Sequence, residues 1–370
     1  MKIVLLYLGR KGAGPVYTIE FAKALLVRNC ELFVVVSSCS DNIEDWRNLQ
    51  HEYGFAYKEV KTYNNKTEFC LNSFNLLQYY RICKAINQFT PHFVLSTMTH
   101  PWHNIIYSFL KKGIVRVKVI HDVIPHTGED SCIQRLFNWM DIHISDYWIT
   151  LTRKSKEALV GKGIDENRIG IIPHANFSFY KNNSDISYNE NKLYNKIAFF
   201  GRINKYKGVD VLLNAFAKVK LHLPNLKLLI AGNGDCTAYG AFFDEHKDAL
   251  ELHVRWIEDD EIASLLVDTD LVIIPYIEAT QSGVIPLAYA LGKPVVATCV
   301  GGIPEQVPSK CGILIPPNDA EAIANAILTL YSDTQKMSSM GKNALKYAEE
   351  ELSWDKSAQL LLDFYNNNCC

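Results

Sequence analysis

The sequence predicts an α/β protein made of two doubly wound parallel-sheet domains joined by a linker. The chain has 370 residues, of which 48% are hydrophobic, enough for two cores of roughly 150–200 residues each. Short apolar runs, typical of buried strands, alternate with stretches of helical period along most of the chain. The alternation stops at residues 174–195, where Asn, Ser and Tyr dominate without a period, as is typical of an exposed linker.

A strand, a glycine-rich loop and a helix open the chain. Ile3–Tyr7 is an apolar run, residues 9–14 read GRKGAG, and Val16–Val27 repeats apolar side chains at helical spacing. Gly12 and Gly14 allow the backbone to approach a phosphate or an acceptor group at the helix N-terminus, or they serve only a tight turn. The loop lacks GxGxxG spacing, so a dinucleotide-binding motif is disfavoured.

The rest of the first half continues the alternation. Strands are expected at Leu32–Val36, Phe55–Val60, Phe93–Ser96, Val115–Ile120, Tyr147–Thr150 and Arg168–Pro173, with helices at Asp41–Tyr53, Phe74–Phe89, Trp102–Lys111 and Arg153–Gly161. Open parallel sheets bind ligands at the carboxyl ends of their strands. His121 follows one such strand directly, in the run HDVIPHTGED, so we expect it to be functional. A satisfied structural histidine is the alternative, and His126 is a weaker candidate.

A second alternation of the same kind follows the linker. We expect strands at Ile197–Phe200, Leu226–Ala231, Leu252–Trp256, Leu271–Ile274, Val295–Ala297 and Gly312–Ile315, and helices at Val209–Lys220, Ala238–Ala249, Asp259–Val267, after Ser282-Gly283 and beyond residue 315. The expected domains are residues 1–180 and 190–350, and we expect them to face each other across a cleft.

The last helix, within residues 351–370, is expected to pack back on the first domain. It carries an apolar stripe that the completed second sheet does not need, formed by Trp354, Leu360, Leu361 and Phe364. The alternative is a helix that simply caps the second domain.

The loop GRINKYKG, at Gly201–Gly208, carries the first strong indication of a ligand. Arg202 and Lys207 follow a strand directly, and two fixed cations at a strand end suit a diphosphate. A solvated basic turn is the alternative, and it is the interpretation we adopt for Lys205. The chain has no GxxxxGK[ST] sequence, so this is not a Walker loop.

The second indication is the βαβ unit at Asp270–Ala297. Its helix begins at Ser282-Gly283, where free backbone N–H groups and the positive end of the helix dipole suit a phosphate. The preceding turn contains Glu278 and Gln281, which suit sugar hydroxyls. An anion site beside a hydroxyl site suggests a nucleotide-sugar.

The charge distribution and the cysteines indicate where in the cell the protein is expected. Residues 1–180 carry 21 Lys and Arg against 16 Asp and Glu, whereas the remainder carries 17 against 24. A basic first half fits a membrane surface or an anionic acceptor, although random variation explains it equally well. The ten cysteines are scattered without CxxC spacing, which favours a reduced, cytoplasmic chain. Cys369-Cys370 lacks the four-residue prenylation pattern.

Several motifs, in order and spacing, resemble those of one enzyme family. They are GRINKYKGVDVLLNAF, LLIAGNGD, DLVIIPY, SGVIPLAYALGKPVVAT and GGIPEQV in the second domain, with the N-terminal glycine loop, HDVIPH and the Trp354 helix in addition. Together they are similar to the group 1 (family 4) glycosyltransferases of GT-B fold. The resemblance spans nearly the whole chain but does not identify the sugar.

The resemblance implies retaining, metal-independent transfer from a nucleotide-sugar, without a further cofactor. By this likeness Arg202 and Lys207 hold the diphosphate, Gly283 offers its backbone N–H, and His121 lies near the transferred sugar. With Glu278 these side chains are the catalytic candidates. The residues expected to bind the donor are Gly12, Gly14, Gly201, Arg202, Lys207, Gly232, Ile257, Glu278, Gln281, Ser282, Gly283, Val284 and Glu305.

The sequence departs from the family pattern at two positions. Most members have two glutamates separated by seven residues, and the corresponding positions here are Ala279 and Leu287. Glu278 is adjacent to the first position and is expected to replace it, whereas a leucine cannot accept hydrogen bonds from ribose. Glu305 is the nearest acidic alternative.

The expected partners are a UDP- or GDP-sugar donor and a glycan or lipid-linked glycan acceptor, with peripheral contact to the inner membrane and no nucleic acid. The family likeness suggests bacterial surface polysaccharide synthesis, such as lipopolysaccharide. A phosphorylase or epimerase of the same fold, or a catalytically impaired nucleotide-sugar binding protein, remain alternatives. Free nucleotide diphosphate that forms only with a hydroxyl acceptor would favour transfer.

Overall fold

The computed structural model describes residues 1–123, 139–177, 179–182 and 193–369, and these fold into two compact units. The N-terminal unit holds the described chain up to Pro173 together with the segment from Trp354 onward, and the C-terminal unit lies within His174–Ser353. The chain therefore changes units before residue 180, the expected end of the first domain. The part of HDVIPHTGED beyond Val123, including His126, lies outside the described residues, as does Cys370.

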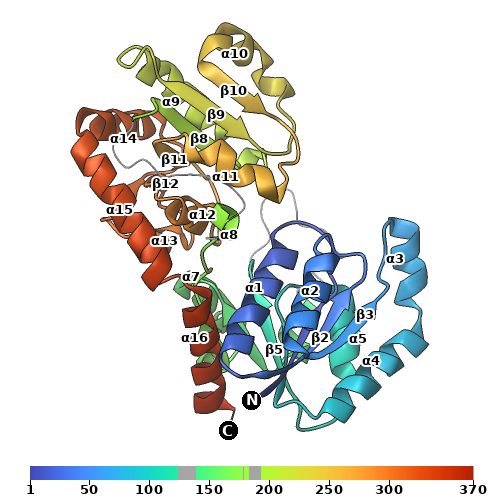
Figure 1. Cartoon of the computed structure of the whole chain (residues 1–370). Helices are drawn as coiled ribbons and strands as arrows, with labels where there is room; N and C mark the ends of the chain where they lie inside the picture. Colours follow the sequence, from blue (N-terminus) through green and yellow to red (C-terminus); the bar gives the residue numbers. More distant parts are fainter. Residues whose placement is uncertain (124–138, 178, 183–192, 370) are drawn as a thin grey trace. The chain divides into compact units, whose positions relative to one another are not determined.

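The N-terminal unit is built on a seven-stranded parallel sheet of order β3-β2-β1-β4-β5-β6-β7. Its strands are β1 (Lys2–Tyr7), β2 (Glu31–Ser37), β3 (Ala56–Val60), β4 (Phe93–Ser96), β5 (Val115–Ile120), β6 (Tyr147–Thr150) and β7 (Ile169–Ile171). The helices are α1 (Ala13–Val27), α2 (Ile43–Tyr53), α3 (Lys66–Ser73), α4 (Leu76–Phe89), α5 (Pro101–Ser108) and α7 (Arg153–Val160) (Figure 1). The doubly wound fold is confirmed for this unit.

The C-terminal unit has a six-stranded parallel sheet of order β10-β9-β8-β11-β12-β13. Its strands are β8 (Lys196–Phe200), β9 (Lys227–Ala231), β10 (Leu250–His253), β11 (Leu271–Ile274), β12 (Val295–Thr298) and β13 (Gly312–Ile315). The helices are α8 (Phe179–Asn182), α9 (Val209–Lys220), α10 (Gly240–Glu245), α11 (Asp259–Val267), α12 (Val284–Ala290), α13 (Ile303–Gln306), α14 (Ala320–Ser332) and α15 (Thr334–Glu350). The strand order reverses between β8 and β11, where ligands of such sheets bind.

The last helix, α16 (Trp354–Asn368), belongs to the N-terminal unit. The Trp354 ring packs edge-on against Tyr17 of α1, with 5.0 Å between the ring centroids. Arg28 binds Asp355 through two hydrogen bonds of 2.8 Å. This is the packing that the apolar stripe of the helix predicts.

Several elements differ from the expectation. Helices α3 and α13 were not predicted, α8 lies in the stretch expected to be an exposed linker, and β10 ends at His253 rather than at Trp256. The single helix expected over Ala238–Ala249 is instead the short α10 between two 3-10 turns. Across the described ranges, every helix is too short or too polar to span a lipid bilayer.

Candidate functional site

The loops at the carboxyl edge of the second sheet are joined to one another by backbone hydrogen bonds. The Gly201 N–H donates to the Ala231 carbonyl oxygen at 2.9 Å, and Ile203 N–H donates to Asn233 at 2.8 Å. These bonds join the loop after β8 to the loop after β9. The exposed Arg202 side chain belongs to the first of these two joined loops, the one after β8.

Two glycines allow the loops to approach this closely. Gly232 has φ +147°, and a Cβ atom there would lie 1.9 Å from the Gly201 carbonyl oxygen. Gly208 has φ +66°, and a Cβ atom there would lie 2.0 Å from the Pro275 carbonyl oxygen. Any other residue would force these loops apart.

Lys207 is held at the end of β11 by two tyrosines. Its ammonium nitrogen lies 3.6 Å from the centroid of the Tyr276 ring and 5.2 Å from that of Tyr206. Within the described residues, these ring contacts are the only polar or ionic interactions of the Lys207 side chain. A half-buried cation over an aromatic face can bind an anion with the N–H groups that do not face the ring.

The Tyr276 side chain connects Lys207 to the start of α12. Tyr276 is only 1% exposed, and its hydroxyl lies 3.3 Å from the Ser282 hydroxyl. The Tyr206 carbonyl accepts a hydrogen bond from the Ile277 N–H at 2.8 Å, which fixes the two loops together. Tyr276 was not predicted as a site residue, because an aromatic residue after an apolar strand reads as core.

Ser282 differs from its expected role as a phosphate ligand. Its N–H donates to the Gln306 side chain at 2.7 Å, and its hydroxyl accepts from the Val284 N–H at 3.2 Å. The Gln306 amide in turn donates to the Ser282 carbonyl at 3.1 Å. Ser282 therefore shapes the turn, and Gly283, the N-cap residue of α12, stays as the backbone donor that we predict for an anion.

The expected sugar-binding residues lie in one folded segment. Glu278 is exposed in the turn after β11, and the buried Oε1 atom of the half-buried Gln281 has no hydrogen-bond partner in the described structure. An unsatisfied buried amide oxygen costs about 1–3 kcal/mol. The Gly302 N–H donates to the Thr280 carbonyl at 3.2 Å, so the loop bearing the exposed Glu305 packs on this turn.

Two positions of interest are part of the hydrophobic core. Leu287 is 4% exposed and Ile257 is 7% exposed, and both belong to the core cluster of the C-terminal unit. The Leu287 side chain therefore packs within the protein. Ile257, which we expected to bind the donor, could do so only through its backbone. Val284 is half-buried and packs against the same cluster.

His121 lies in the N-terminal unit, whereas Arg202, Lys207 and Glu278 lie in the C-terminal unit. The His121 Nε2–H group donates to the Thr97 carbonyl oxygen at 3.0 Å, and the ring packs edge-on to Tyr17. Burial lowers the pKa of His121, so the side chain is neutral at pH 7. A neutral imidazole can orient a hydroxyl group without adding a charge.

The glycine loop of the N-terminal unit has a packing role at one of its two predicted positions. Gly14 is buried, and a Cβ atom there would lie 2.8 Å from the Tyr7 hydroxyl. Gly12 has φ +87° with open space around it, and it precedes the first residue of α1. Only Gly12 therefore has room for a ligand beside its Cα atom, and its ligand stays a prediction.

A cavity of about 580 Å³, lined by both polar and aromatic residues, lies at the carboxyl edge of the first sheet. Its lining comes from the loops after β1, β3 and β4, from the start of α3 and from Asp141: Arg10, Tyr63, Asn64, Asn65, Lys66, Phe69, Thr99, His100, Pro101 and Asp141. The His100 Nδ1 atom accepts a hydrogen bond from the Trp102 N–H at 3.2 Å, whereas Nε2 is buried without a partner in the described structure. Sequence reasoning missed this cavity, because its residues are far apart in the chain.

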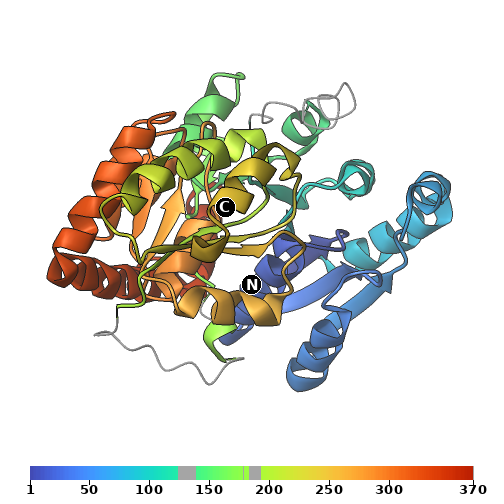
Figure 2. The ribbon, with the colours of Figure 1, turned by 90° about the horizontal axis from the view of Figure 1, so that it is seen from above.

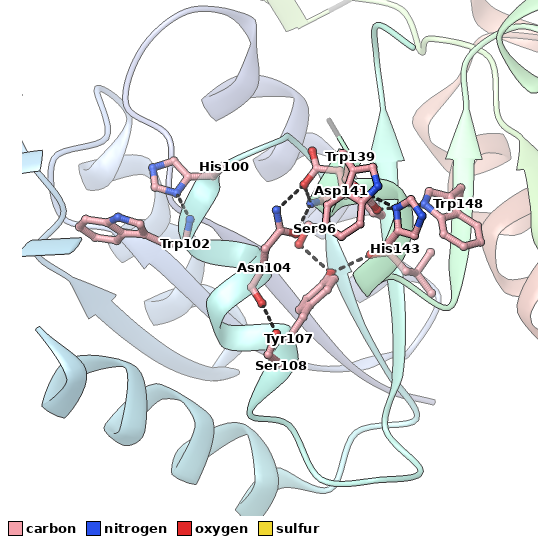
Figure 3. A network of polar contacts seen from close by, with 12 residues as sticks. Ser96, His100, Trp102, Asn104, Tyr107, Ser108, Trp139, Asp141, His143 and Trp148 are labelled. Carbon is pink, nitrogen blue, oxygen red and sulfur yellow. Dashed lines mark hydrogen bonds and ion pairs between the residues drawn. The ribbon is translucent and has the colours of Figure 1, made fainter. Parts of the chain in front are cut away.

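A buried ion pair includes Asp141, which lines this cavity. Figure 3 shows the polar network around Asp141 and Asn104. The fully buried Lys118 pairs with Asp141, and Asn104 bonds to both, at 3.0 Å from Lys118 and at 2.7 Å from Asp141. Burial lowers the pKa of Lys118, and the Asp141 charge opposes that shift. Burial, with a smaller contribution from the nearby Lys118 charge, lowers the pKa of His100 to about 3. His100 is therefore neutral at pH 7, and its Nε2 atom carries the proton.

No group of three or more His, Cys, Asp or Glu side chains is placed to hold a metal ion within the part of the chain that the structure describes.

Comparison with known proteins identifies the C-terminal unit. Residues 194–333 match the family model for group 1 glycosyl transferases. A D-inositol 3-phosphate glycosyltransferase from Corynebacterium aurimucosum is 26% identical over 273 residues, 68% of this chain and 64% of the relative. An uncharacterized glycosyltransferase from Methanocaldococcus jannaschii is 31% identical over 178 residues, 46% of this chain and 44% of the relative. The chain thus spans less than two thirds of these relatives.

Solved structures of the same fold cover the whole chain. HepE from Anabaena, crystallised with UDP, has a TM-score of 0.71 and 17% identity, and the match covers 99% of this chain and 100% of HepE. Sucrose-phosphate synthase from Thermosynechococcus elongatus has a TM-score of 0.71 and 17% identity, with 98% of each chain covered. Residues 194–333 therefore resemble the group 1 glycosyl transferases, and the two sheets have the GT-B fold of these solved structures.

Proposed function

We propose that this protein is a retaining glycosyltransferase that moves a sugar from a UDP- or GDP-sugar to a hydroxyl group of a glycan or lipid-linked acceptor. The observation that carries the proposal is the position of Lys207. Its ammonium group is held over Tyr276, whose hydroxyl reaches the turn that begins α12. Solved relatives by fold bind UDP and UDP-glucose, which supports a nucleotide-sugar as the donor.

The charge changes of the reaction assign the roles of the side chains. Cleavage of the bond between the sugar and the phosphate builds negative charge on the diphosphate and positive charge on the sugar ring. Arg202, Lys207 and the Gly283 N–H would stabilise the first charge. Glu278 and Gln281 would accept hydrogen bonds from the sugar, and Glu278 would also favour the positive ring.

Retention would follow from attack on the face that the diphosphate leaves. The acceptor oxygen forms the new bond to the sugar carbon as the sugar–phosphate bond breaks, and the acceptor proton moves to a phosphate oxygen. In this scheme two protein cations, rather than a metal ion, balance the diphosphate charge.

We place the acceptor on the N-terminal unit, with His121 near the transferred sugar. The relatives named as acting on D-inositol 3-phosphate suggest a polyol acceptor. The cavity lined by Arg10, Tyr63 and Asn65 offers cationic, aromatic and amide groups suited to such a molecule. Surface polysaccharide synthesis at the cytoplasmic face of the membrane is the setting that we propose.

An epimerase is the second candidate, because a solved UDP-GlcNAc 2-epimerase from Neisseria meningitidis shares the fold, with a TM-score of 0.61. A nucleotide-sugar binding protein without turnover is the third, because Leu287 packs in the core and offers nothing to ribose.

The test is a thermal-shift screen of nucleotide-sugars, followed by product analysis with and without hydroxyl acceptors. A glycosylated product together with free nucleotide diphosphate supports transfer. Conversion of the donor without an acceptor indicates an epimerase, and binding without any product indicates a binding protein.

A further inference from the structure

The N-terminal unit exposes several large apolar side chains on α3, on α4, in the turn between them and just after α5. This α3–α4 surface consists of Leu71, Phe74, Leu76, Leu77, Tyr80 and Phe109, which are 69%, 83%, 70%, 56%, 63% and 63% exposed. Figures 1 and 2 show α3 and α4 at the outer side of this unit. Single exposed apolar residues are ordinary, but six together indicate an interaction surface.

The exposed residues are not needed to pack these helices against the rest of the unit. Helix α4 already buries Tyr79, Ile82, Cys83 and Ile86 against the unit. Helix α3 buries none of its residues. The Trp102 indole N–H donates to the Ser73 hydroxyl at 2.9 Å, which holds the turn between α3 and α4 in place. The surface is therefore presented by an ordered part of the fold.

A groove of about 520 Å³ runs between α4 and the end of α5. Leu76, Tyr80 and Phe109 line it together with Lys84 and Lys111. The Lys111 N–H donates to the Asn87 side chain at 3.0 Å and joins the two walls. The groove thus combines apolar side chains with ammonium groups.

Basic side chains dominate the charge of the same region. Residues 66–89 and 109–113 contain one acidic residue, Glu68, and five basic ones: Lys66, Arg81, Lys84, Lys111 and Lys112. All five are exposed, and none forms an ion pair among the residues that the structure describes. The whole chain, in contrast, has a net charge of −2.

We infer that the α3–α4 surface docks on an anionic lipid bilayer. The apolar side chains would enter the boundary between headgroups and acyl chains, while the five cations meet lipid phosphates. Two copies of this chain that met through this surface would instead place the same five cations opposite each other, and these charges would repel. The inference goes beyond the proposed transfer reaction and does not depend on the donor site. A lipid-linked acceptor is part of the proposed function. If the acceptor is lipid-linked, the cavity that Lys66 lines would open beside the membrane that carries the acceptor.

The test is co-sedimentation of the full chain with vesicles of phosphatidylcholine, with and without phosphatidylglycerol. We expect binding only when phosphatidylglycerol is present. Binding should weaken with added salt, because the Debye length falls from about 10 Å at 0.1 M to about 3 Å at 1 M ionic strength.

Variants of the surface make the test specific. Phe74→Ser with Leu77→Ser should lower the partition coefficient at least about tenfold, and Lys84→Gln with Lys111→Gln should lower it about fivefold for each charge. The matched controls are Leu221→Ser, at a position that is 82% exposed in the C-terminal unit, and Lys247→Gln, which is also exposed. Both controls should bind vesicles like the wild type.

Several outcomes would overturn the inference. These are no sedimentation with phosphatidylglycerol vesicles, equal losses in the surface and control variants, or a dimer that Phe74→Ser dissociates. UDP binding is measured in parallel without vesicles, and the surface variants should retain it. If the wild type binds vesicles but no nucleotide, the proposed transfer reaction fails and the docking surface stands.

Discussion

Lys207 gives the most direct test of the donor site. Its ammonium group faces the Tyr276 ring at 3.6 Å, so Lys207→Ala removes a fixed cation without opening a core cavity. We expect turnover at saturating donor to fall by about two to three orders of magnitude. Arg202→Ala should have the same effect.

The control for both changes is Lys205→Ala in the same loop, where the side chain is exposed. This variant should keep the wild-type rate. A wild-type rate for Lys207→Ala or Arg202→Ala, with donor saturating, would remove that residue from the diphosphate site.

Glu278→Gln tests the sugar end of the same site. The carboxylate is exposed in the turn that packs on the Tyr206 loop, where its charge would favour the positive ring of the transition state. We expect turnover to fall much more than the affinity for free nucleotide diphosphate, which lacks the sugar. Steady-state kinetics and calorimetry measure the two effects. Equal losses, or none, would instead favour Gln281 as the sugar ligand.

His100 should make the N-terminal unit sensitive to acid. Its pKa is lowered to about 3, against about 6.5 in an unfolded chain, so between these values the unfolded state binds a proton that the folded state excludes. The free energy of unfolding therefore falls as the pH falls below about 6.5. From pH 7 to pH 5 the loss through His100 is about 2 kcal/mol.

The variant His100→Asn isolates this contribution. Asparagine can still accept the hydrogen bond that caps α5, but it does not titrate. The urea dependence of amide exchange in α5 measures the free energy of unfolding at pH 7 and at pH 5. The difference between the two pH values should be smaller by about 2 kcal/mol in the variant than in the wild type. His103, whose pKa burial also lowers, retains its own contribution in both proteins. An unchanged pH effect would contradict the assignment to His100.

The sequence points to the candidate cations Arg202 and Lys207, but it does not predict the ring contacts that hold Lys207. Arg202 and Lys207 could be identified because glycines and a strand end bracket their loop. The positions of Tyr276 and Gln306 could not, since their partners are set by folding: the Gln306 side chain bonds to a backbone 24 residues away. The same limit applies to the cavity at His100, whose walls come from separate loops.

At the level of elements, α16 should stabilise the N-terminal unit. Trp354 is 9% exposed, and its ring packs on Tyr17 and Phe21. Trp354→Ala should destabilise this unit by about 3–5 kcal/mol through the cavity that it leaves. Urea-dependent amide exchange of β1 measures the effect. The exposed Asn366→Ala on the same helix is the control, and equal stabilities of the two variants would contradict the packing role.

Elements whose side chains are buried were predicted from the sequence, and elements that bury little were not. Strands such as β1, β11 and β12 were found because their apolar runs are fully buried. Helix α3 was missed because it buries no residue and therefore has no hydrophobic period. The helix expected over residues 238–249 is shorter, with α10 beginning at Gly240, a residue type that disfavours helix.

For the whole molecule, we expect UDP to protect only one unit. The candidate donor residues of the joined loops, from Gly201 to Glu305, all lie in the C-terminal unit. At a concentration 100 times its dissociation constant, UDP should stabilise that unit by about 2.7 kcal/mol. Hydrogen exchange should slow there, around residues 201–208 and 278–284, and stay unchanged in β1–β4. Protection confined to the N-terminal unit would reverse the assignment of donor and acceptor.

The return of α16 to the first sheet affects the order in which the protein can mature during synthesis. Helix α1 packs on a segment that the ribosome translates only after the whole of residues 174–353. Domains of most multidomain chains fold in the order in which they emerge, but here the unit that emerges first must wait for the one that emerges second. The Tyr17 and Phe21 faces stay uncovered during that interval. A nascent chain halted before residue 354 should therefore bind hydrophobic-patch chaperones through α1, and release them once α16 has left the exit tunnel.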